Sequence, residues 1–540
     1  SALQSNTTGA NNTAVGDQAL DQNTTADNNT AVGNDALLLN TTGDQNVAVG
    51  ATCLDANTTG AQNTAVGRAC LTANTTGNFN VAIGNRALKS ATTADKNVAV
   101  GRGALEQNTT ASNNTAVGYL ALENNTTGDV NTAVGYLALD ANTTAGVNTA
   151  VGAFALSGTT TGGENTAVGY EALSVSTDAG QCVAVGAYAL ENNSSGDRCV
   201  AVGYKAGEAN LENDLVAVGY YAAIKNTTGS ANTALGRQAL EQNEVGVSNT
   251  AVGYNALEDN TASNNTAVGT SSLTNNTTGT QLTAVGTNSL DANVSGNYNA
   301  GFGASALTNN TTGSNNTAIG RNSLFANTTA SNNTAVGASV MSSNTTGTAN
   351  TAVGLIAMGA NTTGSYNVAI GQNALDTNLT GSDNVAVGYL SLDKTTEDQN
   401  TAVGNYSLRE NTTGEYNTAM GYQALTKNTN ADNHAAFGYK ALFSCTTGTS
   451  NTAVGLNAGY NVTTASSTVC IGTEAGDSIT AGLDNTIIGA GSDVDSTNRH
   501  NSVALGQGVS TAASNSTFRV QGGNGVFHTG NTTTWSTTSD

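Results

Sequence analysis

The chain has 540 residues, including 64 glycines and no proline, and charged residues make up 10% of it, so an ordinary globular core with large side chains is not expected. Its net charge of −22 argues against a nucleic-acid partner, because an acidic surface repels phosphates. The sequence contains no run of about 20 apolar residues, and we therefore expect no direct insertion into a membrane.

A phrase close to Asn-Thr-Ala-Val-Gly recurs along most of the chain. A regular series of glycines, from Gly16 through Gly33 and Gly50 to Gly506, anchors its copies, and the few shortened intervals lack a single residue. The stretch 114–130 shows the full unit, Asn-Thr-Ala-Val-Gly-x-x-Ala-Leu-x-x-Asn-Thr-Thr-Gly-x-x. We number positions from the anchor glycine, so that Asn114 lies at position −4 of the repeat anchored on Gly118. A fixed short period indicates a stack of identical units.

Each unit is too short for a pair of helices but long enough for two or three short strands with turns. Thr and Val favour strands, while Gly and Asn tolerate the positive φ angles of tight corners. Alternation in Thr-Ala-Val-Gly places Thr and Val on one face of a strand and Ala on the other. The sequence therefore predicts an all-β fold, a parallel β-solenoid or β-roll with one coil per 17-residue repeat.

The recurring asparagines have two interpretations. Stacked in register, each side-chain amide would bond to the amides above and below it and form a ladder. Alternatively, each asparagine caps a turn within its own coil. The sequence leaves both interpretations open, and neither implies catalysis.

The apolar content of a coil is small, at about three side chains per repeat, most of them alanine, valine or leucine. Oligomerisation is one way to strengthen so thin a core. Three chains packed side by side would share their apolar faces, and we therefore expect a homotrimer.

The phrase Asn-Thr-Ala-Val-Gly-x-x-Ala-Leu resembles the head repeats of trimeric autotransporter adhesins. That resemblance implies a left-handed parallel β-roll and a trimer. The adhesin coil is shorter, and the additional residues of this chain fall in the Asn-Thr-Thr-Gly corner. The resemblance extends from Ser1 to about Gly506.

The repeat also resembles phage tail-fibre shafts, some of which lose a C-terminal intramolecular chaperone after they trimerise. In those fibres the sequence before the cut is often β-rich and ends near Ser-Asp. The Thr-rich segment that ends in Ser539-Asp540 is similar to such an end. This resemblance implies a mature fibre.

Three segments are distinguished along the chain. Residues 1–455 form the regular repeat shaft, 456–506 are divergent capping coils, and 507–540 leave the period and form a C-terminal tip or foot. The candidate tip contacts are Phe527, His528 and Trp535. The alternative for this last segment is a cap that seals the open end of the core.

The six cysteines suggest two disulfides. Cys53 and Cys70 both lie at position +3, and Cys182 and Cys199 both lie at position −4, so each pair is one coil apart. Stacked coils bring their Cα atoms to about 4.8 Å, within disulfide range. The alternative is a pair of buried free thiols. Cys445 and Cys470 are out of register, and we expect them to be unpaired.

Tyrosine often follows an anchor glycine and would then form rows along one edge. The candidate stacking row comprises Tyr119, Tyr136, Tyr204, Tyr220, Tyr422 and Tyr439, and Tyr170, Tyr254 and Tyr389 share the position. Such rows could stack on sugar rings, or they could pack a subunit contact or cover a corner.

The sequence shows no grouping of residues that would form a catalytic or metal-binding site. The three histidines, His434, His500 and His528, form no Ser/His/Asp grouping, and His434 takes the place of an asparagine at position −4. No Cys-x-x-Cys occurs, and the Gly-Gly-x-Gly-x-Asp pattern of calcium β-rolls is missing. We expect no enzyme activity, no cofactor and no bound metal.

These observations favour a structural, extracellular fibre on a virion or cell surface, with an adhesive role toward a glycan or protein receptor. The alternative is a self-assembling extracellular filament or matrix protein, in which open coil edges template the next subunit. Ice binding by threonine rows is a minor alternative, since only one threonine of each Asn-Thr-Thr points outward.

Overall fold

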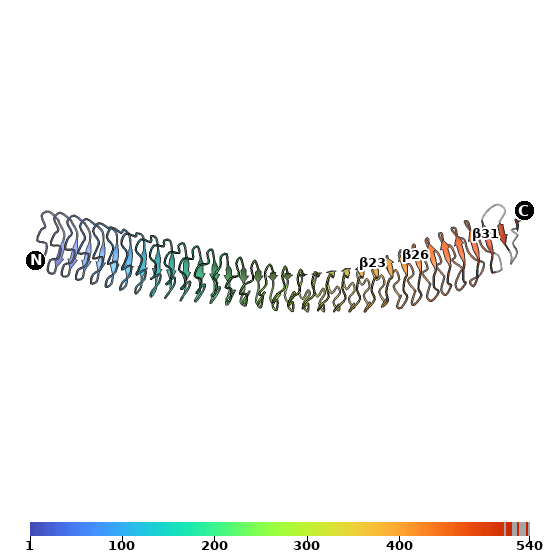
Figure 1. The fold of residues 1–540 in the computed structure, drawn as a ribbon. Helices are drawn as coiled ribbons and strands as arrows, with labels where there is room; N and C mark the ends of the chain where they lie inside the picture. The colour runs from blue at the N-terminus through green and yellow to red at the C-terminus, as the bar shows by residue number, and fades with distance from the viewer. Residues whose placement is uncertain (512–514, 521–525, 529–535, 538–540) are drawn as a thin grey trace. The chain divides into compact units, whose positions relative to one another are not determined.

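The computed structural model describes residues 1–511, 515–520, 526–528 and 536–537, and it divides into two units, Ser1–Thr270 and Ser271–Asp540. Each unit is a parallel β-solenoid in which every repeat makes one coil (Figure 1). This confirms the predicted all-β fold with one coil per repeat.

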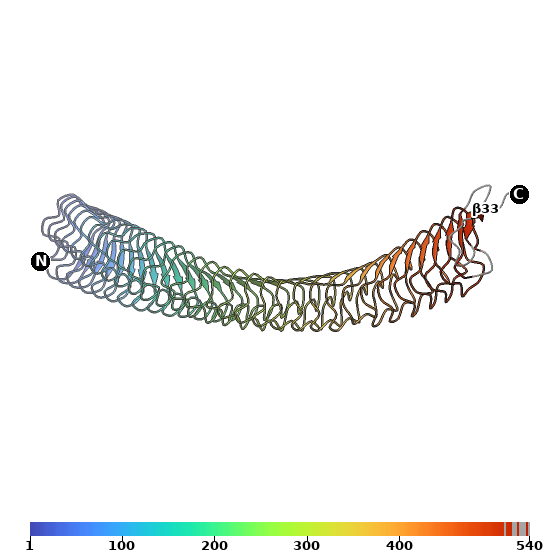
Figure 2. The same ribbon diagram turned by 45° about the vertical axis from the view of Figure 1, so that its right-hand side comes forward.

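The first unit contains sixteen three-residue strands, each paired in parallel with the strand one repeat away. Their bounds are β1 (Thr13–Val15), β2 (Thr30–Val32), β3 (Val47–Val49), β4 (Thr64–Val66), β5 (Val81–Ile83), β6 (Val98–Val100), β7 (Thr115–Val117), β8 (Thr132–Val134), β9 (Thr149–Val151), β10 (Thr166–Val168), β11 (Val183–Val185), β12 (Val200–Val202), β13 (Val216–Val218), β14 (Thr233–Leu235), β15 (Thr250–Val252) and β16 (Thr266–Val268). The register is strict, with Ala116 opposite Ala133 and Ala133 opposite Ala150. In Figure 2 these strands follow one another along one wall of the stack.

The second unit continues the same pattern and ends differently. Its strands are β17 (Thr283–Val285), β18 (Ala300–Phe302), β19 (Thr317–Ile319), β20 (Thr334–Val336), β21 (Thr351–Val353), β22 (Val368–Ile370), β23 (Val385–Val387), β24 (Thr401–Val403), β25 (Thr418–Met420), β26 (Ala435–Phe437), β27 (Thr452–Val454), β28 (Val469–Ile471), β29 (Thr486–Ile488), β30 (Val503–Leu505), β31 (Phe518–Val520), β32 (Val526–His528) and β33 (Ser536–Thr537). Val503 pairs in parallel with Phe518, so the coil pattern continues past Gly506. The pairings β31–β32 and β32–β33 are antiparallel.

Each regular coil has one strand, not the two or three that the sequence suggested. The remainder of the coil consists of turns whose backbone groups bond to neighbouring coils. For example, the Leu20 N–H donates to Ala36 O at 3.0 Å, and the Thr24 N–H donates to Thr41 O at 3.2 Å. Because these bonds already satisfy the turn backbone, additional strands are not needed to pair it.

The core of a coil is formed by positions −2, +3 and +4. In the coil anchored on Gly118 these are Ala116, Ala121 and Leu122, all fully buried. Thr115 is half-buried and Val117 is exposed, on the opposite face of the strand. The predicted alternation and the three small apolar side chains per coil are therefore confirmed.

Two columns of asparagine amides run inside the stack, at positions −4 and +7. At position +7, Asn57 Nδ2 donates to Asn40 Oδ1 at 2.8 Å in the preceding coil and to Gly60 O at 2.9 Å in its own corner. At position −4, Asn63 Nδ2 donates to Asn46 Oδ1 at 3.1 Å. The asparagines thus form ladders between coils and also hold the turn of their own coil, so both interpretations of the sequence apply.

The anchor glycines are fixed by their conformation and by close backbone approach. Gly118 has φ = +144°, and a Cβ atom there would lie 2.1 Å from Gly135 O in the next coil. Residues with a Cβ atom rarely adopt this φ, and the short distance leaves no space for a methyl group. Glycine at this position therefore allows the coils to stack at strand spacing.

The sequence suggested positive φ angles at glycine and asparagine, but the structure extends them to other residues. Position +4 is left-handed too, as in Leu20 with φ = 53°. That conformation costs roughly 1–2 kcal/mol in an L-residue. Full burial of a leucine side chain returns about 1.5–3 kcal/mol, and the Leu20 N–H gains its acceptor in the next coil. Packing between coils therefore outweighs local propensity.

The shortened repeats lose their residue in a corner and keep the strand register. Val200 pairs with Val216 across a shortened repeat, just as Val183 pairs with Val200 across a repeat of full length. In the shortened corner Asn210 Nδ2 donates to Glu212 O, two residues on, where a full corner spans three. The deletion therefore leaves the core columns aligned.

Candidate functional site

The outward side of the sheet in the first unit is uncharged and mostly apolar. We call the side chains at positions −3 and −1 of β1–β16 the outer sheet face. These positions hold only Thr, Val, Ile and Leu. Val117, Val134 and Val151 are 36–37% exposed, and they occupy the same position on consecutive coils. A continuous exposed apolar stripe is typical of an interaction surface.

The predicted tyrosine row is present on both units. In the first, Tyr119 and Tyr136 stack with ring centroids 5.3 Å apart, and Tyr204 and Tyr220 with centroids 5.6 Å apart. In the second, Tyr422 and Tyr439 stack at 5.4 Å.

Rings at position +2 also extend the row, which was predicted from position +1 alone. Phe154 lies 5.3 Å from Tyr136, and Tyr188 lies 5.9 Å from Tyr204, both nearly perpendicular to their neighbours. In the second unit Tyr406 takes the same position between Tyr389 and Tyr422. The signal was available, because positions +1 and +2 share one corner and an aromatic residue at either one can reach the row.

Several ring faces in these rows are occupied by cationic side chains of the protein. Arg102 lies over Tyr119 at 5.3 Å, and Arg237 lies near both Tyr220 and Tyr254. Edge-to-face and offset ring pairs contribute about 0.5–1.5 kcal/mol each. The rows therefore stabilise the coil edge, and sugar stacking on them stays a prediction.

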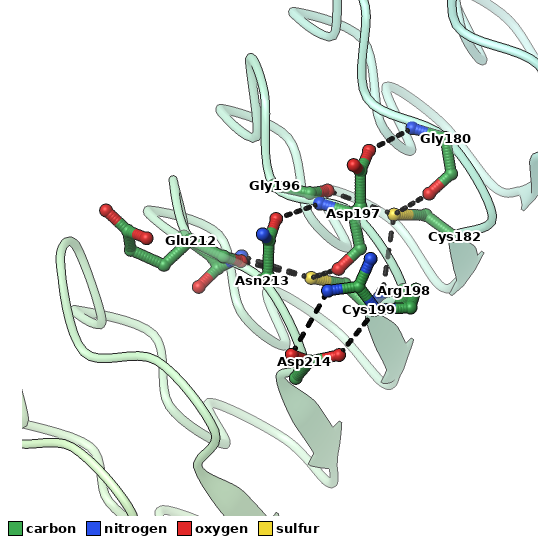
Figure 3. Close-up of polar contacts among 10 residues, drawn as sticks. Gly180, Cys182, Gly196, Asp197, Arg198, Cys199, Glu212, Asn213 and Asp214 are labelled. Atoms are coloured by element: carbon green, nitrogen blue, oxygen red, sulfur yellow. Dashed lines mark hydrogen bonds and ion pairs between the residues drawn. The ribbon is translucent and has the colours of Figure 1, made fainter.

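The four cysteines of the predicted disulfides lie on neighbouring coils and are fully buried free thiols. Cys53 Sγ donates to Ala65 O at 3.2 Å and Cys70 Sγ donates to Gly84 O at 2.6 Å, and the neighbouring Cys70 thiol, together with burial, raises the pKa of Cys53. Cys182 Sγ accepts the Cys199 N–H at 3.4 Å (Figure 3). Each pair is therefore placed in contact, as the register predicted, and the disulfides themselves stay a prediction.

Cys445 and Cys470 occupy two unrelated columns. Cys445 replaces the position +7 asparagine, and its Sγ lies 3.6 Å from His434 Nε2. Cys470 replaces the strand alanine of β28, opposite Ala453. Burial raises the pKa of both thiols to about 12, so they are neutral and unreactive at physiological pH.

His434 stands in the position −4 ladder, as the sequence indicated. It donates its N–H to Asn417 Oδ1 at 3.0 Å, and its Nδ1 accepts the Asn451 N–H at 3.1 Å. The side chain is 2% exposed, and desolvation lowers its pKa to about 4. The ring is therefore a neutral substitute for an asparagine amide.

Position +5 carries a column of carboxylates. Among them, Glu106 is buried and pairs with Arg86. Burial, together with the nearby Glu123, raises the pKa of Asp140 to about 6. Within the described residues, no group of three His, Cys, Asp or Glu side chains could hold a metal ion.

The candidate tip residues fall at the margin of what the structure describes. Phe527 and His528 belong to β32, whose backbone pairs with β31, and their side chains lie outside the described part. Trp535 lies outside the described residues altogether. The tip contacts therefore stay a prediction.

Comparison with protein-family models, with curated proteins and with solved structures gives no match for this chain. Among the described residues there is also no helix with the length and hydropathy to cross a bilayer.

Proposed function

We propose that the protein is a structural extracellular fibre with an adhesive role, and that it acts as a homotrimer joined through its outer sheet face. The uncharged outer sheet face is the observation that carries this proposal. All charged side chains of Ser1–Thr270 lie off that face, although the whole chain carries 54 formal charges. Exposing so regular an apolar stripe to water is unfavourable. Packing it against the same stripe of other chains removes that exposure.

Stiffness of the coil stack supports a fibre. The amide ladders are buried and link consecutive coils, and the anchor glycines set a close backbone spacing. Each coil is bonded to its neighbours through backbone and side chain alike, so bending a unit would stretch many bonds at once. A rigid support suits a protein that presents a binding end at a distance from a virion or a cell.

The adhesive role rests on the resemblance of the repeat to adhesin heads and to phage fibre shafts. Its partner would be a cell-surface glycan or protein. The chain would carry out no catalysis and need no cofactor, because its side chains serve to stack the coils.

The mass of the native assembly tests the association. We expect a trimer of the 53.7 kDa chain by native mass spectrometry, with and without reductant. The double variant Val117→Lys and Val134→Lys places two charges on the outer sheet face and should give monomers. Thr127→Lys adds a charge in the same coils at an exposed corner and should leave the trimer intact.

Two results would count against this function. A monomer at micromolar concentration would overturn the homotrimer, and an equal effect of Thr127→Lys would show that the outer sheet face is not the contact. Assemblies that lengthen with concentration in electron micrographs would favour the self-assembling filament instead.

A further inference from the structure

A polar column at position −6 links most coils of the first unit through side-chain oxygens. The backbone N–H at this position donates to the side chain one coil further on. Thus the Ser112 N–H donates to Asp129 Oδ1 at 2.6 Å, and the Asp95 N–H donates to Ser112 Oγ at 3.0 Å. Asp, Asn or Ser supplies the acceptor in these coils.

Three consecutive coils break this column, because Gly146, Gly163 and Gly180 have no side chain to offer. The N–H groups of Asp129, Gly146 and Gly163 consequently have no acceptor among the described residues. The column resumes at Asp197, whose Oδ1 accepts the Gly180 N–H at 2.8 Å (Figure 3). Three stacked backbone donors are thus left unpaired on one edge.

A surface pocket of about 480 Å³ lies along this gap, lined by the three glycines. Val147 contributes an apolar wall and is 57% exposed. The polar wall is formed by Glu164, Asp178, Gln181 and Asp197. The volume falls in the range of small-ligand sites, and a mixture of apolar surface and a few polar groups is characteristic of them.

The hydrogen-bonding pattern limits the class of ligand. The carbonyls of Asp129, Gly146 and Gly163 already accept N–H groups, as in Val147 N–H to Asp129 O at 3.0 Å. An extended peptide needs donors and acceptors in alternation from the backbone that it joins, and this edge offers donors alone. The pocket's carboxylates repel phosphate and other anions.

We propose that this pocket binds a neutral polyhydroxylated ligand, a short segment of a glycan chain. A hydroxyl accepts one hydrogen bond and donates another, so each can accept from a glycine N–H and donate to a carboxylate. Donors one coil apart, about 4.8 Å, are far enough from each other for each to bond a different hydroxyl of the ligand. Val147 supplies contact for the apolar face of a sugar ring. Such binding does not require the chains to associate through the outer sheet face.

The test uses the whole chain and restores the missing side-chain oxygens. Gly146→Ser and Gly163→Ser supply the acceptors that Ser112 supplies in its own coil, and they fill the pocket. Neither glycine has a positive φ, so a serine fits the backbone, with a small shift of the neighbouring carbonyl. Val247→Ser places the same hydroxyl in the same column several coils away and is the matched control.

Binding would first be surveyed on an array of neutral and acidic glycans, and the strongest neutral oligosaccharide would then be titrated by calorimetry. We expect neutral glycans to bind, the double serine variant to lose at least tenfold in affinity, and Val247→Ser to bind like the unsubstituted chain. Melting temperatures would show that both variants fold.

Three results would overturn the proposal. The unsubstituted chain could bind no neutral glycan on the array, or the double serine variant could bind as tightly as the unsubstituted chain. Inorganic phosphate or Ca²⁺ could instead bind with a loss in the double serine variant, which would assign the pocket to an ion. If the Val117→Lys, Val134→Lys variant is monomeric and still binds the oligosaccharide, glycan binding is independent of the proposed trimer.

Discussion

Asn74 Nδ2 donates to Asn57 Oδ1 at 2.7 Å, and the two buried side chains belong to consecutive coils. This pair is one rung of the position +7 ladder. The rung joins coils that are otherwise held by short strands and small apolar contacts. A buried amide that loses its partner costs about 1–3 kcal/mol, so the continuity of the ladder decides local stability.

The ladder has a gap at Ala91, which leaves Asn74 Oδ1 buried without a hydrogen-bond partner. We expect Ala91→Asn to close the gap, because its amide can donate to Asn74 and accept from Asn108. The unfolding free energy should rise by about 1–2 kcal/mol, measured by urea denaturation. Ala91→Leu adds similar volume without an amide and should not stabilise the chain. Equal effects of the two variants would contradict the ladder.

An alanine at an anchor glycine should be far more damaging than one elsewhere in the same coil. Gly118→Ala combines a disfavoured φ with a clash against Gly135 O, and we expect a loss of at least about 2 kcal/mol. Thr127→Ala is the control, because Thr127 lies at an exposed corner of the same coil and has no positive φ. Hydrogen exchange of the flanking coils would show where the stack opens. Comparable protection in the two variants would argue against close backbone stacking.

Acid should weaken the coils around His434. Its folded-state pKa of about 4 lies below the ordinary value of 6.5, so the unfolded chain binds more protons between these pH values. The stability that the neutral ring contributes is therefore complete above pH 6.5 and is lost as the pH falls toward 4, by about 3 kcal/mol in total. His434→Asn restores the ladder residue and should reduce this pH dependence. Melting curves at pH 7 and pH 5 that shift equally in both proteins would refute the assignment.

Oxidation should join the aligned cysteines and spare the others. Diamide takes two hydrogens from each thiol pair, and we expect Cys53–Cys70 and Cys182–Cys199 disulfides by peptide mapping, with Cys445 and Cys470 still free to be alkylated once the oxidised chain is unfolded. Each bond closes a loop of about one coil, which stabilises by about 3 kcal/mol in the chain-entropy account. Bonds between residues of different columns would contradict the register.

The sequence was sufficient to predict the columns, because a strict period brings equal positions into contact. The register of Cys53 with Cys70 and the ladder place of His434 follow from counting residues. The left-handed conformation of Leu20 could not be predicted, since leucine disfavours it locally and only packing between coils stabilises it. Contacts between coils also explain why fewer strands form than the sequence suggested. The amides of the turns donate to carbonyls of adjacent coils, so the turn backbone needs no strand pairing.

The candidate pocket could have been anticipated in part. Three glycines in a row at position −6, Gly146, Gly163 and Gly180, stand out in a column that elsewhere often carries Asp, Asn or Ser. The sequence does not show that a backbone N–H of one coil donates to the side chain of the next. Unless the donor and the acceptor of these bonds are known, three missing side chains do not reveal three unpaired N–H groups.

Distances between spin labels test the stacking most directly. Thr25, Thr59 and Thr127 share the exposed position +9 of the first unit, and the cysteines would be replaced by the commonest residue of each column. Four coils separate Thr59 from Thr127 and six separate Thr25 from Thr127, so pulsed electron paramagnetic resonance should give about 19 Å and about 29 Å. Separations that do not increase in proportion to the number of coils would contradict the solenoid.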